Sequence, residues 1–115
     1  MKRILITGAL GQLGSELAAA LREQYGVDNV VVTDIRDDVN RELVAGGPFE
    51  ILDAQKGEAI HDVVRRHKID TIYHLAALLS ATAEQRPQLA WELNMSSLIA
   101  VLEVAREEGC AVFTP

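Results

Sequence analysis

The sequence is poor in the residues that define several classes of protein. Its 115 residues include one cysteine, Cys110, and three prolines, and aromatic residues make up 4%. A single cysteine excludes an intrachain disulfide and is typical of a protein of the reducing cytoplasm, where we expect this one to be located. No apolar run approaches the roughly 18 residues of a membrane-spanning helix, so we expect no membrane partner. A signal peptide is not expected either, because Gly8 interrupts the opening apolar stretch and Glu16 and Arg22 are charged.

Positive charge is also scarce. Eleven basic residues stand against 17 acidic ones, which gives a net charge of −6 and a pI near 4.9. Such a surface repels a phosphate backbone, so we expect no nucleic-acid partner. His61 and His67 lie six residues apart on one predicted helix. We expect no carboxylate or thiol cluster near them, and we therefore interpret them as helix-surface residues and expect no metal site.

Two hydrophobic periodicities alternate along the chain. Apolar residues spaced three to four apart predict helices over 12–25, 54–67 and 87–108. Short runs rich in β-branched residues predict strands over 3–7, 29–33, 49–52, 71–75 and 111–113. Strands that alternate with helices favour right-handed crossovers, and hence an α/β fold whose parallel sheet has helices on both faces. No change of composition marks an internal boundary, so we expect one domain over residues 1–115.

Three glycines follow the first predicted strand and open the first predicted helix: Gly8, Gly11 and Gly14. In such a turn the first glycine supplies tight backbone angles, the second lets a pyrophosphate approach the main chain, and the third lets the helix pack closely. The N–H groups at the start of the helix, at Gln12 and Leu13, are candidates to hold the phosphates. Glycines in this context predict a dinucleotide-binding, Rossmann-type doubly wound sheet with strand order 3-2-1-4-5.

Asp34 closes the second predicted strand, 20 residues after Gly14. From this position a carboxylate can accept hydrogen bonds from the adenosine ribose, and it would repel the 2′-phosphate of NADP. NAD is therefore the predicted cofactor. Ile35 and Arg36 complete this candidate segment; we expect Arg36 to stack near the adenine or to face solvent rather than to soften the preference for NAD.

Beyond the glycine turn the chain resembles the extended short-chain dehydrogenases, the family of NAD-dependent epimerases and dehydratases. Two residues in each glycine gap are typical of that family. The other matching residues are Leu52 and Asp53 after the third strand, His74, Leu75, Ala76 and Ala77 at the end of the fourth, and Asn94 in the long helix. The resemblance implies that the first pair contacts the adenine and that the second segment lies beneath the ribose and nicotinamide. It also implies that Asn94 buttresses the fourth strand and the active site, whereas His74 is interpreted as a packed strand-end residue.

Within the family, residues 6–17 and 77–84 are most similar to the short-chain-type L-threonine 3-dehydrogenases. The resemblance implies a small-molecule substrate, L-threonine, which is oxidised to 2-amino-3-oxobutanoate with hydride transfer to NAD. It places Ser80 at the substrate end of the pocket, although a helix-capping or turn serine is the alternative for this residue. A sugar-nucleotide epimerase or dehydratase of the same family is the alternative function.

The residues that carry out the family's reaction are not expected in this chain. Catalysis there needs a tyrosine four residues before a lysine, which lowers the pKa of the tyrosine. Tyr25 is followed at that distance by Asn29, and Tyr73 by Ala77. We therefore expect the nucleotide-binding, N-terminal part of a longer NAD-dependent dehydrogenase, whose catalytic residues and substrate lobe follow Pro115. The chain alone is expected to be inactive.

Two alternatives from other classes stay open. A receiver-type signalling domain would place its phosphorylated aspartate at Asp53, but Thr7 and Gly8 stand where that class carries an acidic pair. An S-adenosylmethionine-dependent methyltransferase also uses glycines after the first strand and acidic residues after the second and third, usually with tighter glycine spacing. A P-loop is excluded because Gly14 is followed by serine and glutamate, without the lysine that the motif requires.

The sequence also predicts self-association. In the strand order 3-2-1-4-5 the fifth strand is an edge, and an uncovered apolar edge can pair with another chain. Apolar residues spread around most of the helix over 87–108, so more than one of its faces should be buried. One face would pack on the sheet, and the other resembles the face that forms homodimers in this family. Trp91 on this helix is interpreted as a core or interface residue.

Overall fold

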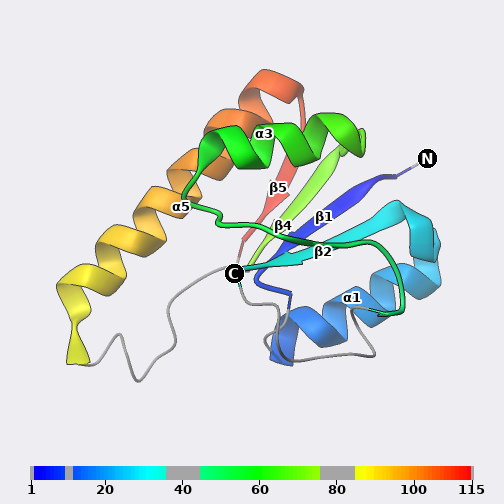
Figure 1. Ribbon diagram of the computed structural model, residues 1–115, viewed down its shortest axis with the longest axis horizontal. Helices are drawn as coiled ribbons and strands as arrows, with labels where there is room; N and C mark the ends of the chain where they lie inside the picture. Colours follow the sequence, from blue (N-terminus) through cyan, green and yellow to red (C-terminus); the bar gives the residue numbers. More distant parts are fainter. Residues whose placement is uncertain (1, 10–11, 36–44, 76–84, 115) are drawn as a thin grey trace.

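The computed structural model describes residues 2–9, 12–35, 45–75 and 85–114 (Figure 1). The described elements begin with a strand, and helices follow the first, third and fourth strands. The strands are β1 (Ile4–Thr7), β2 (Val30–Asp34), β3 (Phe49–Ile51), β4 (Thr71–His74) and β5 (Ala111–Phe113). The helices are α1 (Gln12–Tyr25), the 3₁₀ turn η1 (Val27–Asn29), α3 (Gly57–Arg66) and α5 (Pro87–Glu108).

All five strands pair in parallel, in the order β3-β2-β1-β4-β5, which confirms the predicted Rossmann-type sheet. Ile6 of β1 lies between Val32 of β2 and Tyr73 of β4, and Thr7 lies beside His74. The carboxyl ends of β1, β2 and β4 therefore reach the same edge of the sheet.

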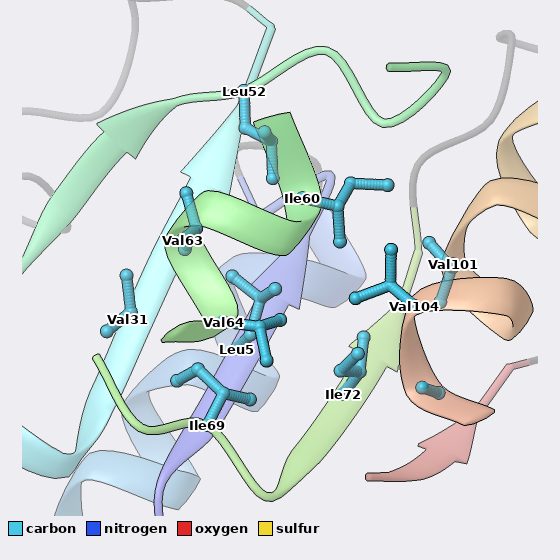
Figure 2. Close-up of a cluster of buried hydrophobic side chains, with 11 residues drawn as sticks. Leu5, Val31, Leu52, Ile60, Val63, Val64, Ile69, Ile72, Val101 and Val104 are labelled. Carbon is cyan, nitrogen blue, oxygen red and sulfur yellow. The ribbon is translucent and has the colours of Figure 1, made fainter. Parts of the chain in front are cut away.

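Helices cover both faces of the sheet (Figure 1). α1 packs on one face, where Ile4 and Ile6 of β1 are buried beneath it, and α3 and α5 pack on the other. Successive strand residues point to opposite faces, so Leu5 belongs to the second core. That core contains Leu5, Val31, Leu52, Ile60, Val63, Val64, Ile69, Ile72, Val101, Val104 and Ala105 (Figure 2). Burial on both faces explains why the central strands are continuous apolar runs.

Several element boundaries differ from the predicted ones. β2 is displaced by one residue towards the carboxyl end, and β3 and β4 each end one residue early. The largest difference is the start of α3, at Gly57 rather than residue 54. Asp53 forms a turn there: its carboxylate accepts the N–H of Gln55 and its carbonyl accepts the N–H of Lys56, both at 3.0 Å. A side-chain acceptor of this kind competes with helical hydrogen bonding and delays the helix.

The outer face of α5 stays exposed. Trp91 is 62% exposed, which excludes the core alternative of its interpretation as a core or interface residue, and Ile99 and Leu102 are exposed on the same helix. No helix in the described part of the chain, including the long α5, has the length and hydropathy of a membrane span.

Close packing at Gly14 generates a prediction about stability. A Cβ atom at this position would lie 2.6 Å from the carbonyl oxygen of Gly8 and 2.7 Å from the Cα of Ala9, which are backbone atoms. Gly14→Ala should therefore lower the free energy of unfolding, measured by urea denaturation, by about 1–3 kcal/mol. Gly57→Ala is the matched control, because a Cβ there meets no atom within 4 Å. The control should be neutral or slightly stabilising, and equal losses at the two positions would contradict the prediction.

Candidate cofactor-binding site

Two neighbouring strands send the chain to opposite faces of the sheet. β1 continues into α1 on one face, whereas β4 is followed by α5 on the other (Figure 1). In doubly wound sheets, ligands bind outside the carboxyl ends of two such strands, because the diverging connections leave room there. The edge formed by the ends of β1, β2 and β4 is therefore the candidate site.

The glycine turn lies at the centre of this edge. Gly8 has a φ of +68°, a left-handed conformation that costs glycine little. The N–H of Ala9 donates to the carbonyl of Thr33 at 2.9 Å, which joins the turn to β2. Gly11 lies outside the described residues, as does the side chain of Gln12, the residue at which α1 begins.

The start of α1 is suited to a negatively charged group. Leu13 is 58% exposed beside the turn, and the first turn of the helix contains no acidic side chain. The partial positive charge of the helix N-terminus is therefore not neutralised within that turn, and its N–H groups can donate to an anion.

β2 brings Asp34 to the same edge. Asp34 is the last residue of the strand and is 6% exposed, and its carbonyl accepts the N–H of Leu52 at 2.9 Å. Ile35 is 62% exposed, and Arg36 lies outside the described residues. Leu52 is buried in the core beneath α3, whereas Asp53 is half-buried, so Asp53 is the more accessible of that pair.

β4 brings Leu75 beside the glycine turn. The N–H of Leu75 lies 3.1 Å from the carbonyl oxygen of Thr7 and 3.1 Å from its hydroxyl oxygen. Ala76, Ala77 and Ser80 lie outside the described residues. The structure thus brings together the predicted residues Gly8, Gly14, Asp34 and Leu75.

Asn94 is half-buried on α5, and its carbonyl accepts the hydroxyl of Ser97 at 3.0 Å. Ser97 in turn contacts His74, with 3.3 Å between Ser97 Oγ and His74 Nε2. Asn94 therefore lies one helical turn from the residue that touches the end of β4.

His74 is a packed strand-end residue, as predicted, but its partners were missed. It is 4% exposed, and its Nδ1 lies 2.8 Å from the hydroxyl oxygen of Thr7. Burial lowers the pKa of His74 below its ordinary value, because the surroundings disfavour the charged imidazolium. The predicted pairing of the first and fourth strands could have found Thr7, whereas no sequence signal indicates Ser97.

His61 and His67 have carboxylate partners that the sequence does not reveal. His67 pairs with Glu50 of β3, and His61 contacts Glu108 and lies 3.6 Å from Glu107 on α5. The sequence does not indicate these carboxylates, because they come from other elements of the fold. Within the described ranges, no group of three or more histidines, cysteines and acidic residues could hold a metal ion.

The lowered pKa of His74 predicts how stability depends on pH. Below a pH of about 6.5 the unfolded chain takes up a proton at His74 that the folded chain resists, so the free energy of unfolding falls as the pH decreases. The expected slope is at most about 1.4 kcal/mol per pH unit. Hydrogen bonds from neighbouring arginines hold the pKa values of Glu50 and Glu108 below the usual range. The contribution of these two carboxylates to the stability of the fold is therefore lost only in more acidic solution.

Urea denaturation between about pH 7 and pH 5 measures this effect. His74→Asn is the reference, because asparagine does not titrate. The unmutated protein should lose more stability than His74→Asn over this range. An equal loss in the variant would assign the pH dependence to other groups.

Comparison with known proteins places the chain in a family. The NAD dependent epimerase/dehydratase family matches residues 4–114. An uncharacterized epimerase/dehydratase of Staphylococcus haemolyticus is 54% identical over 115 residues, which are 100% of this chain and 36% of that protein.

Solved structures of L-threonine dehydrogenases are also similar. The enzyme from Clostridium difficile has 49% sequence identity and a TM-score of 0.94, over 100% of this chain and 36% of that one. The GalE-like enzyme from Cupriavidus necator has 48% identity and a TM-score of 0.88, over 96% of this chain and 35% of that one. The chain spans about a third of the length of these relatives. Because the family match extends over almost the whole sequence, the chain belongs to the NAD-dependent epimerase/dehydratase family, whose cofactor is NAD.

Proposed function

We propose that this chain is the NAD-binding part of an L-threonine 3-dehydrogenase. The observation that carries the proposal is the similarity to the Clostridium difficile enzyme, at 49% identity over the whole chain. Since the chain covers 36% of that enzyme, the oxidation of L-threonine is assigned to the longer protein and the binding of NAD to this part. When bound, NAD supplies the hydride acceptor.

The pyrophosphate of NAD is assigned to the glycine turn, at Gly8, Gly11 and Gly14. Two features of the described residues support this assignment: the left-handed conformation of Gly8 and the absence of acidic side chains in the first turn of α1. The N–H groups at Gln12 and Leu13 would donate to the phosphate oxygens, because they lie in that first turn.

The adenosine half is assigned to the ends of β2 and β3. Asp34 would accept hydrogen bonds from the ribose hydroxyls, and its position as the last residue of β2 supports this role. Ile35 and Arg36 would line the adenine on one side. Leu52 and Asp53 would contact it on the other, because the hydrogen bond between Asp34 and Leu52 holds the two strand ends together.

The nicotinamide half is assigned to the segment after β4. Leu75, Ala76 and Ala77 would lie beneath the ribose and nicotinamide, and Asn94 would support them from α5. Ser80 would contact the substrate. No residue of this chain is proposed to be catalytic, and the tyrosine and lysine that the reaction needs are assigned to the remainder of the longer protein.

A second copy of the protein is the proposed macromolecular partner. The exposure of Trp91, Ile99 and Leu102 on α5 supports a homodimer through this helix. A contiguous patch of exposed apolar side chains is typical of an interaction surface, and we propose that these three side chains form one.

A sugar-nucleotide epimerase or dehydratase is the second candidate function. The Staphylococcus haemolyticus relative favours it, because that protein is described as an epimerase/dehydratase and is 54% identical to this chain. The two candidates share the NAD site and differ in the substrate, so a substrate assay distinguishes them.

The full-length protein that contains this chain should reduce NAD in the presence of L-threonine, as measured by the absorbance of NADH. Residues 1–115 alone should give no turnover, because the proposed catalytic residues lie elsewhere. UDP-glucose and UDP-galactose, assayed in parallel for interconversion, should not react. Epimerisation without oxidation of L-threonine would favour the second candidate and overturn the first.

Asp34 should determine the preference for NAD over NADP. Asp34→Ser removes the carboxylate that would bind the ribose and repel a 2′-phosphate. The difference between the binding free energies of NAD and NADP, measured by calorimetry, should therefore decrease by about 1–3 kcal/mol. Asp28→Ser is the matched control, because it removes the same charge from an exposed position just before β2. Equal affinities of the unmutated protein for NAD and NADP would contradict the assignment.

A further inference from the structure

Three polar side chains lie buried together between β1, β4 and α5. Thr7, His74 and Ser97 are 1%, 4% and 5% exposed. Two residues earlier on the same strands, Leu5 and Ile72 belong to the apolar core beneath α3 and α5 (Figure 2). Buried polar groups cost free energy unless they are hydrogen-bonded, and apolar residues could have continued this core. Packing alone therefore does not explain why these three buried positions are polar.

One arrangement of the protons satisfies all of the contacts among these side chains. In this arrangement the Ser97 hydroxyl donates to the carbonyl oxygen of Asn94, which can only accept, and accepts from His74 Nε2. With the proton on Nε2, the Nδ1 of a neutral imidazole is an acceptor. Thr7 then donates to His74 Nδ1 at 2.8 Å and accepts the N–H of Leu75 at 3.1 Å. Each donor in this relay meets an acceptor.

We propose that Thr7, His74 and Ser97 are positioning residues that hold the two halves of the NAD site at a fixed separation. The inference rests on the proposed NAD site and adds residues to it that do not themselves touch the cofactor. The low pKa of His74 is consistent with this role, because the relay needs a neutral imidazole.

The connectivity of the chain supports this role. Each member of the relay is next to a residue assigned to the NAD site, either along the chain or one helical turn away. The pairs are Thr7 with Gly8, His74 with Leu75, and Ser97 with Asn94. A shift at any of the three would therefore move the phosphate turn, the segment after β4, or α5 relative to the other two.

Hydrogen bonds suit this task better than apolar contacts. Apolar contacts are non-directional, whereas hydrogen bonds weaken steeply as their angles change. Misplacing a cofactor-binding group by about 1 Å can cost about 100-fold in rate, so a directional link between β1, β4 and α5 has functional value.

The test measures NAD affinity by calorimetry on the full-length protein that contains this chain. Thr7→Val keeps the shape of the side chain but removes its hydroxyl, and it should weaken NAD binding about 5- to 30-fold. Thr7→Ser restores the hydroxyl and should bind within about twofold of the unmutated protein. Ser97→Ala opens the relay from the α5 side without altering β1, and it should weaken binding about 3- to 10-fold.

Thr71→Val is the matched control. Thr71 is also a buried threonine, 3% exposed, but it lies at the amino end of β4, where its hydroxyl donates to Asp70 at 2.8 Å. The control should lose stability comparably to Thr7→Val and should bind NAD with unchanged affinity.

A second measurement, made in the absence of NAD, determines which ring nitrogen of His74 carries the proton. Nitrogen NMR spectra of labelled protein should show His74 as the neutral tautomer with the proton on Nε2. The Nδ1 resonance should shift in Thr7→Val, which removes its donor, and should stay in place in Thr71→Val.

Several outcomes would overturn the inference. Unchanged NAD affinity in both Thr7→Val and Ser97→Ala would overturn it while leaving the proposed function intact, as would an equal loss of affinity in Thr71→Val. A proton on Nδ1 of His74 would overturn the assigned direction of the relay. An unmutated protein that does not bind NAD would overturn the proposed function and, with it, this inference.

Discussion

The close approach of α1 to the end of β1 is the constraint on which the site depends. Because Gly14 lacks a Cβ atom, the first turn of α1 can lie against the backbone of Gly8 and Ala9. Ala9 is fully buried, and its N–H donates to the carbonyl of Thr33 while its carbonyl accepts the hydroxyl of Ser15 at 3.1 Å. One residue thereby joins β1, β2 and α1. The N-terminus of the helix is directed at the turn by this arrangement, and the rest of the candidate site lies around it.

The parts of the fold that local physics determines could be predicted from the sequence. Val30, Val31 and Val32 are fully buried on a strand covered on both faces, and such a strand is a continuous apolar run. The glycine spacing predicted the turn because two of its positions exclude larger residues, Gly8 through its backbone conformation and Gly14 through its contacts. Strand order followed from the class of fold that these two signals define together.

Contacts between distant elements could not be predicted. Ser97 meets His74 only because α5 crosses the sheet at the end of β4, and neither the crossing nor its register is encoded in a local pattern. The contact between Glu50 of β3 and His67 at the end of α3 could not be predicted either, for the same reason. The late start of α3 has a local cause, because the Asp53 carboxylate accepts a backbone N–H that would otherwise belong to the helix. The spacing of apolar residues, from which the helix was predicted, contains no information about this hydrogen bond.

Polar groups have different roles at the amino ends of the strands, here called the amino edge of the sheet, and at their carboxyl ends, the carboxyl edge. At the amino edge, the main-chain N–H of Arg3 donates to the Asp70 carboxylate at 3.1 Å, and its guanidinium donates to the His67 carbonyl at 2.9 Å and to Asn29 Oδ1 at 3.1 Å. One residue thus joins β1 to the approaches of β2 and β4, and it satisfies a carbonyl at the end of α3 that the helix leaves without an intrahelical partner. These bonds stabilise the sheet at the edge away from the candidate site. The carboxyl edge can therefore carry features that stability alone does not require, such as the left-handed turn at Gly8 and a buried polar relay, because the strands are already held in register from the other end.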